Sequence, residues 1–232
     1  MTRVAYLGPA GTFTEEAALR FGIEDAQYVP VESPAAALAA LDAGEAEYAV
    51  CAIENSIDGA VTTTMDALAA TENARIVGEI ELAIAFAVMT RQGHTLSDAL
   101  RLATHPVAHQ QVKRWMAKHA PRAQFIPASS NAAAAKMVAD DNADVAVAPE
   151  RAAALHGLEV HARGVADAET ARTRFVLVAK RPALPEPTGN DRTAIVFRTK
   201  NEPGALVRVL QEFAARGVDM TRIESRPTRE EP

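Results

Sequence analysis

The sequence predicts an α/β fold in which two α/β lobes surround a cleft and a smaller module follows. Strand-like apolar runs alternate with helix patterns, which is typical of parallel βαβ units. A long strand-like segment at residues 76–89 interrupts this alternation, as a crossing from one sheet to another would. Prolines and a glycine then separate residues 1–181 from residues 193–232, with residues 182–192 as a linker (Pro182, Pro185, Pro187 and Gly189).

The first lobe is expected to comprise about residues 1–78 plus 163–181. Its strands are predicted at residues 3–7, 27–31 and 48–53. A turn with two glycines precedes an alanine-rich helix, for which Thr14 is the expected N-cap. Ser33 and Pro34 begin the next helix, which should end near Gly44. A third helix is expected to begin around Thr62.

The second lobe is expected to comprise about residues 79–162. Its strands are predicted at residues 102–104, 123–126, 145–148 and 158–162. Its helices are predicted at residues 107–119, at residues 132–139 after a capping segment at 129–131, and from Pro149. Residues 171–178 then form a strand that returns to the first lobe, which would set Thr173 and Arg174 at the floor or hinge of the cleft, both facing into it, with residues 176–178 anchoring the strand.

Composition excludes several classes of protein. A net charge of -6 without a cluster of Lys and Arg argues against nucleic-acid binding. The lone Cys51 excludes a disulfide framework and fits a reducing compartment. The longest apolar run, residues 82–89, is too short to span a bilayer, and the N-terminus has no signal-peptide pattern. We therefore expect a cytoplasmic protein with no membrane partner.

Four polar loops each follow a strand and precede a helix: residues 8–14, 54–58, 105–106 and 129–131. Helix N-termini offer unpaired N–H groups and a partial positive charge, so such loops suit carboxylates or phosphates. Helix capping is the alternative role for each loop taken alone. Neither a phosphate-binding glycine motif nor the ligand spacing of a metal site is present, so we expect no metal.

In their amino-acid sequences and in their order along the chain, these segments resemble the prephenate dehydratase family, and the resemblance covers the whole chain. The matching segments are Gly8 to Phe13, Ile53 to Ser56 with Gly59 to Val61, His105-Pro106, Ser130-Asn131 and Thr173-Arg174-Phe175. The last module resembles the family's ACT regulatory domain. The resemblance implies two lobes like those of type II periplasmic binding proteins, followed by an incomplete ferredoxin-like α+β module at residues 193–232.

The reaction implied by the resemblance is decarboxylation and dehydration of prephenate to phenylpyruvate. Aromatisation supplies the driving force, so no cofactor is expected. Thr173 is the residue that the family's pattern marks as essential, and we expect it to hydrogen-bond the leaving hydroxyl and relay a proton. Arg174 suits a carboxylate, and Phe175 either walls the ring or packs in the core. Glu54 and His105 are the candidate titrating partners, each with a structural role as the alternative.

Neutral hydrogen-bond donors are expected to bind the substrate, since they hold carboxylates without adding a competing charge. Their alternative role is making turns and capping helices. The candidates are Gly11, Thr12, Asn55, Ser56, Ser130 and Asn131.

Two segments of the last module look like the family's phenylalanine-sensing motifs: Gly204, Ala205 and Leu206, and Glu224, Ser225, Arg226 and Pro227. In the family L-phenylalanine binds where two such domains pair, which implies an allosteric effector and a homodimer or homotetramer. The module stops before two further strands and a helix of the ACT fold. We therefore expect weak or absent inhibition and an exposed sheet edge.

Two alternative functions are kept open. Arogenate dehydratase uses the aminated analogue of the same substrate, and an additional acidic group facing the amino end would favour it. Two lobes around a cleft are also the plan of non-enzymatic small-molecule sensors. A sensor has no need of the Thr173-Arg174-Phe175 triplet, which favours an enzyme.

Overall fold

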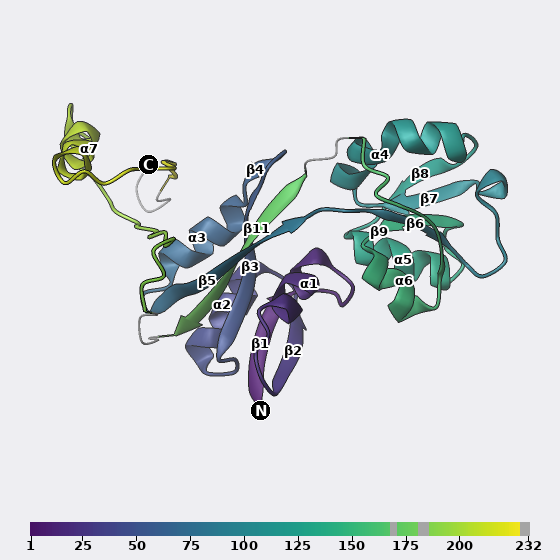
Figure 1. Ribbon diagram of the computed structural model, residues 1–232, viewed down its shortest axis with the longest axis horizontal. Coiled ribbons are helices and arrows are strands. Elements are labelled where there is room, and N and C mark those ends of the chain that lie inside the picture. The colour runs from purple at the N-terminus through teal and green to yellow at the C-terminus, as the bar shows by residue number, and fades with distance from the viewer. Residues whose placement is uncertain (168–170, 181–185, 228–232) are drawn as a thin grey trace. The chain divides into compact units, whose positions relative to one another are not determined.

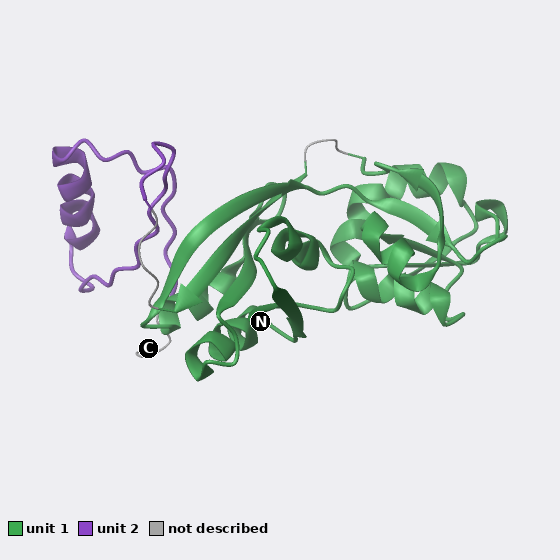
Figure 2. Cartoon of the chain, turned by 60° about the horizontal axis from the view of Figure 1, so that its bottom comes forward, with its two compact units in different colours: residues 1–185 green, residues 186–232 purple. Residues whose placement is uncertain are grey.

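The structure, a computed structural model, describes residues 1–167, 171–180 and 186–227. The chain divides into two compact units, residues 1–185 and residues 186–232 (Figure 2). Of the expected linker prolines, Pro182 and Pro185 lie outside the described residues, whereas Pro187 lies in a stretch without helix or strand.

The first lobe of residues 1–185 is built on a sheet with the strand order β2-β1-β3-β11-β5, and the short β4 pairs with β3 (Figure 1). β1 runs parallel to β2 and β3, whereas β11 runs antiparallel to both β3 and β5. The predicted strands of this lobe are confirmed. Their bounds are β1 (Thr2–Leu7), β2 (Ala26–Val31), β3 (Tyr48–Asn55), β4 (Gly59–Ala60), β5 (Ala74–Ala83) and β11 (Arg172–Lys180).

Three helices cover this sheet, α1 (Phe13–Arg20), α2 (Pro34–Ala43) and α3 (Thr62–Ala70). The Ser33 cap and the Gly44 terminus of α2 are confirmed. The predicted cap Thr14 is wrong, because Thr12 has the extended backbone of an N-cap and its Oγ1 accepts the Glu15 N–H at 3.3 Å. Thr14 is already inside the helix, with its side chain buried.

The sheet of the first lobe is buried on both faces. One core cluster joins α1 to the sheet through Ala17, Ala18 and Phe175. The other joins α2 and α3 to the sheet through residues that include Leu38, Leu41, Met65 and Val176. Successive residues of a strand point to opposite faces, so β11 contributes Phe175 to one cluster and Val176 to the other. Burial on both faces explains why β11 reads as a continuous apolar run.

The second lobe has a sheet with the order β10-β6-β9-β7-β8. Its strands are β6 (Ala87–Thr90), β7 (Arg101–Thr104), β8 (Gln124–Pro127), β9 (Val145–Ala148) and β10 (Glu159–Arg163). Its helices are α4 (Pro106–His119), α5 (Asn131–Ala139) and α6 (Glu150–His156), with a 3-10 turn at Leu96–Asp98. One core cluster packs α5 and α6 on the sheet and another packs α4.

Two extended segments connect the lobes. The expected long strand at residues 76–89 is divided into β5, in the first sheet, and β6, in the second. The return segment runs beside it, since the Ile84 N–H donates to the Ala171 carbonyl at 2.8 Å and the Val165 N–H donates to the Phe86 carbonyl at 3.3 Å. The first sheet extends along β5 to Ala83, beyond the boundary expected near residue 78.

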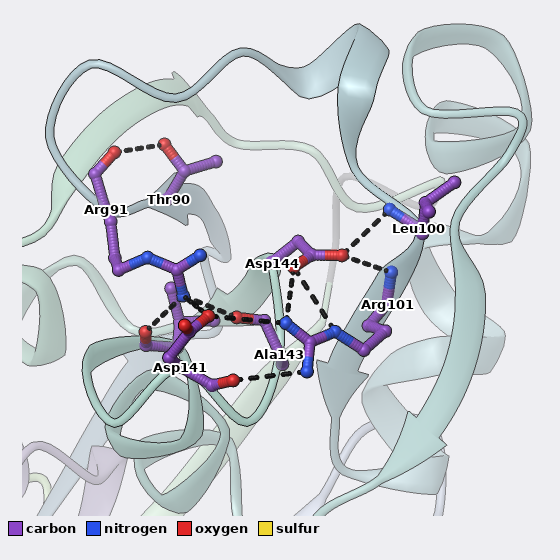
Figure 3. Close-up of polar contacts among 8 residues, drawn as sticks. Thr90, Arg91, Leu100, Arg101, Asp141, Ala143 and Asp144 are labelled. Carbon is purple, nitrogen blue, oxygen red and sulfur yellow. Dashed lines mark hydrogen bonds and ion pairs between the residues drawn. The ribbon is translucent and has the colours of Figure 1, made fainter.

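Two arginines and two aspartates of the second lobe form a network of hydrogen bonds and ion pairs (Figure 3). Asp144 accepts from Nη2 of Arg101 at 2.7 Å and from the Leu100 and Arg101 N–H groups at 2.9 Å. Asp141, at φ 62°, lies 2.9 Å from Nη1 of Arg91, which also donates to the Val138 and Ala143 carbonyls. The network therefore ties the start of β7 to the turn between α5 and β9.

Residues 186–232 contain α7 (Ala205–Ala215), which confirms the helix predicted there and begins after Gly204 at φ 81°. The strands expected at residues 193–198 and 218–226 are wrong over the described residues. Ile195, Val196 and Ile223 have more than half of their surface exposed. An apolar run forms a stable strand only when neighbouring strands and a covering face support it, and these side chains have no such cover.

Candidate functional site

The predicted residues of the first lobe lie at one edge of its sheet. β1 and β3 are parallel, so their carboxyl ends lie at the same edge. β11 runs antiparallel to β3 and begins at this edge, with Thr173 opposite Asn55 and Arg174 opposite Glu54. A β-bulge interrupts the pairing between Arg174 and Phe175. Strand register therefore brings together residues more than a hundred positions apart.

Asn55 holds the hydroxyl of Thr173 in a defined direction. Its Oδ1 accepts the Ile57 N–H at 2.8 Å and the Asp58 N–H at 3.1 Å, which fixes the orientation of the amide. Its Nδ2 must then donate to Oγ1 of Thr173, at 2.8 Å. Because the Thr173 oxygen accepts this bond, its own proton is directed toward another partner. The side chain of Thr173 is buried.

Ser56 connects the start of β11 to the end of β3 through two hydrogen bonds. Its Oγ accepts the Arg172 N–H at 2.9 Å, and its own N–H donates to the Arg172 carbonyl at 2.8 Å. Thr173, the next residue, is thereby held at a fixed position along the strand. This contact gives Ser56 a structural role at the site, beside the predicted role in substrate binding.

Arg174 lies on the face of β11 opposite to Thr173, because consecutive residues of a strand alternate. The expectation that both side chains face the same side of the sheet is therefore wrong. Its Nη2 is 3.5 Å from Oε2 of Glu54 and its Nε is 3.8 Å from Oε2 of Glu79. The Nε atom is buried and has no hydrogen-bond partner among the described residues. Two long ion pairs and an unsatisfied donor leave this guanidinium able to bind a further anion.

Phe175 is 2% exposed and belongs to the core cluster between β11 and α1, with Tyr6, Ala17 and Leu82. The sequence left open whether Phe175 walls a substrate ring or packs in the core. The structure places it in the core, where it supports the strand that carries Thr173.

The predicted residues of the second lobe form a separate group at the carboxyl ends of its parallel strands. Asn131 Oδ1 accepts from Thr104 Oγ1 at 3.2 Å and from the His105 N–H at 3.1 Å, so its Nδ2 group is turned away from this strand end. His105 is the N-cap of α4, and its Nδ1 accepts the Val107 N–H at 3.3 Å. Ser130 is the N-cap of α5, with Oγ accepting the Ala133 N–H at 3.0 Å.

Glu15 is a buried residue that sequence reasoning missed. Its Oε2 accepts from the Gly11 N–H at 2.8 Å and from Nε of Arg151 at 2.7 Å, and its Oε1 accepts from the Tyr6 hydroxyl at 3.1 Å. Burial opposes ionisation of Glu15, but these hydrogen bonds outweigh it and lower its pKa. Burial and the neighbouring carboxylate raise the pKa of Tyr6. The sequence showed only an acidic first helical turn, and nothing in it linked Glu15 to Arg151.

The arrangement offers neutral hydrogen-bond donors, one arginine with spare capacity and an oriented hydroxyl. Within the described ranges, no group of three or more His, Cys, Asp or Glu side chains is placed to hold a metal ion. The described helices include none that is long and apolar enough to cross a membrane. Burial raises the pKa of Cys51 to about 12, so its thiol stays protonated near neutral pH. The chemistry available is hydrogen bonding, anion binding and proton transfer.

Comparison with known proteins supports the same chemistry. The family model for prephenate dehydratase matches residues 4–183, and the model for the ACT domain matches residues 193–231. A prephenate dehydratase of Corynebacterium glutamicum is 55% identical over 234 residues, which cover 98% of this chain and 74% of that protein.

Two solved structures are also similar to this chain. The prephenate dehydratase of Arthrobacter aurescens in complex with L-Phe has a TM-score of 0.91 at 41% identity, and the match covers 99% of this chain and 76% of that one. A structure described as GqqA, a novel type of quorum quenching acylases, has a TM-score of 0.82 at 32% identity, with 99% and 83% covered.

Proposed function

Because the chain belongs to the prephenate dehydratase family, we infer that it is a carbon–oxygen lyase of L-phenylalanine biosynthesis that converts prephenate to phenylpyruvate. The bond from C1 of the ring to its carboxylate breaks and releases carbon dioxide. The electron pair moves through the ring, the C4–oxygen bond breaks, and one proton converts the departing hydroxide to water. The protein must therefore bind a dianion and assist the hydroxyl as it leaves.

We propose that Thr173 assists the leaving hydroxyl, and the Asn55–Thr173 hydrogen bond is the observation that carries this proposal. An alcohol is too weak an acid to supply a proton alone at neutral pH. A hydroxyl that accepts from Asn55 can, however, donate its own proton to the substrate oxygen and recover one from a second group. Thr173 then acts as a relay in a fixed direction.

The proton source is proposed to be His105 or Glu54, the two titrating residues next to the predicted site. His105 uses Nδ1 to cap α4, which leaves Nε2 as the nitrogen that faces another partner. Glu54 pairs with Arg174 on the face of the sheet opposite to Thr173, so as a proton source it would need a path around the end of the strand. His105 belongs to the second lobe, so its participation would require the substrate to lie between the two lobes.

Arg174 is proposed to bind one of the two substrate carboxylates. Its buried Nε has no hydrogen-bond partner among the described residues, which supports this, because leaving such a donor unsatisfied costs about 1–3 kcal/mol. Neutral donors of both lobes would hold the rest of the substrate. These are Gly11, Thr12, Asn55 and Ser56 in the first lobe and Ser130 and Asn131 in the second.

Incubating the protein with prephenate, and separately with arogenate, tests the substrate and the reaction. Phenylpyruvate formed from prephenate is expected, and preferential formation of phenylalanine from arogenate would favour arogenate dehydratase instead. The absence of either product would favour a non-enzymatic sensor. The relatives named prephenate dehydratase at 55% and 41% identity support prephenate as the substrate.

Substituting Thr173 tests the relay. Thr173→Ala should lower kcat by about 10²–10⁴-fold, the usual contribution of a positioned proton-transfer group. Thr173→Ser keeps the hydroxyl and should retain activity within about tenfold of the wild type. A Thr173→Ala enzyme that retains most of its kcat would exclude the relay.

We also propose that L-phenylalanine binds to the ACT module at residues 204–206 and 224–227, as suggested by the relative solved in complex with L-Phe. Calorimetric titration of the whole chain with L-phenylalanine, with prephenate turnover measured in parallel, tests this. Binding with saturable inhibition would support regulation and contradict the weak response expected from the sequence. A homodimer or homotetramer is part of this proposal, because the matched ACT domain is expected to bind L-phenylalanine where two such domains pair. A cytoplasmic location is also proposed, since the relatives are biosynthetic enzymes.

A further inference from the structure

A buried carboxylate joins the two lobes of residues 1–185. Glu15 lies on α1, whose Ala17 and Ala18 pack in the core of the first lobe. Arg151 lies on α6, whose Ala152 and Ala153 pack in the core of the second lobe. Nε of Arg151 donates to Oε2 of Glu15 at 2.7 Å, and the Glu15 side chain is 9% exposed. A hydrogen bond to a largely buried charge is stronger than one between exposed groups.

The same carboxylate fixes the shape of the loop at residues 8–12. Glu15 accepts the Gly11 N–H, and the positive φ of Gly11, 87°, favours glycine. The loop also lies close to the second lobe, because a Cβ added to Gly11 would come within 3.2 Å of the Ala152 Cβ. The conformation of the loop at residues 8–12 and the contact between the two lobes therefore both involve the Glu15 side chain.

The hydrogen bond between Arg151 and Glu15 can break without leaving the Glu15 carboxylate unpaired. Tyr6 and Gly11 belong to the first lobe, as Glu15 does, and both would keep their bonds to it if the lobes moved apart. The Arg151 side chain is 41% exposed and can be hydrated when the bond opens. Opening is thus less costly than breaking a fully buried ion pair, which suits a contact that forms and breaks in each turnover.

We propose that Arg151 is a positioning residue for the dehydration: through Glu15 it couples the approach of the second lobe to the shape of the loop that presents Gly11 and Thr12. The inference rests on the proposed function, in which this loop binds substrate. Arg151 itself would contact no reacting atom. Its loss should therefore weaken substrate binding more than it slows the chemical step.

A matched control lies next to Arg151 in the second lobe. Nη2 of Arg163 is 2.7 Å from Oε1 of Glu150, and both residues belong to the second lobe, on β10 and α6. Arg163→Met thus removes an arginine–glutamate pair of the same length from the same helix without affecting a contact between lobes. Arg151→Met and Arg163→Met change charge and size equally.

Kinetics of these variants with prephenate form the first test. Arg151→Met is expected to raise KM by about tenfold with a smaller change in kcat, and Arg151→Lys should recover part of the loss. Arg163→Met should leave both constants unchanged, and circular dichroism should show that all variants keep the fold. An unchanged KM in Arg151→Met, or an equal rise in Arg163→Met, would overturn the proposal.

Amide hydrogen exchange provides a second test that does not depend on turnover. Peptides covering residues 8–15 should exchange faster in Arg151→Met than in Arg163→Met, because Glu15 loses the partner that Arg151 supplies and holds the Gly11 N–H less firmly, even though that bond can still form. Equal exchange in the two variants would overturn the coupling whatever the activity. If the wild type fails to convert prephenate but exchange differs, the coupling between lobe and loop stands and the proposed function is wrong.

Discussion

At the scale of single residues, the orientation of one amide determines what Thr173 can do. An Asn55 amide rotated by 180° would place its oxygen toward Thr173 and draw the hydroxyl proton to itself. Bonds from Ile57 and Asp58 to Oδ1 prevent this rotation. In the proposed relay, the loop after β3 would therefore act by fixing a hydrogen-bond direction, even where its own side chains do not contact the substrate.

Asn55→Asp tests this interpretation with a nearly isosteric change. A carboxylate accepts bonds from Ile57 and Asp58 equally well but cannot donate to Thr173, so the hydroxyl would turn its proton toward residue 55. We expect kcat to fall by about a hundredfold. Steady-state kinetics with prephenate measure the effect, and circular dichroism checks that the fold is kept. A variant with unchanged kcat would show that the donated bond is not needed.

At the scale of elements, the network between β7 and the turn after α5 makes the free energy of unfolding depend on pH. Hydrogen bonds from Arg101, and from the Leu100 and Arg101 N–H groups, outweigh burial and lower the pKa of Asp144 from 3.8 to about 2. Because the folded state has the lower pKa, the stabilisation is complete above the unfolded value. It is lost as the pH falls from about 4 to about 2.

Asp144→Asn should therefore lower the free energy of unfolding by about 2 kcal/mol at pH 7, with the deficit shrinking below pH 4. Thermal melts across this pH range would measure it, and the unfolding midpoint should fall by roughly 4–8 °C at neutral pH. The control is Lys136→Met, which removes the exposed pair with Asp140 and should have little effect. A deficit that does not change with pH would contradict the role given to the charge.

Sequence patterns predicted most helices and strands because the formation of these elements depends on residues that are close together in the chain. The apolar run of β11, the Ser33 and Ser130 caps and the Gly44 terminus all depend on neighbouring residues. Site contacts such as Asn55 to Thr173 depend on strand register, which spacing along the chain could not supply. The Glu15–Arg151 bond links positions 136 apart, and no feature of either segment indicates the other. The strands expected at residues 193–198 and 218–226 failed because a strand requires partners.

At the scale of the whole molecule, the proposed catalytic residues and the proposed effector site lie in different units. Every residue proposed to contact prephenate belongs to residues 1–185, which form a compact unit. A chain of residues 1–185 should therefore convert prephenate with a kcat within about threefold of the full chain. It should show no response to L-phenylalanine. Loss of turnover in a folded 1–185 chain would show that the second unit contributes to the active enzyme.

The central position of β11 also has a consequence for how the protein is made. β5 pairs in its sheet with β11, and β11 separates β5 from β3. A ribosome therefore releases β5 and the entire second lobe before the strand that joins them to β3 has been synthesised. Until Lys180 emerges, the edges of β3 and β5 lack this partner, and the second lobe must fold within an unclosed loop. Completion of the first sheet is thus a late, long-range event, and the nascent chain is most open to aggregation just before it.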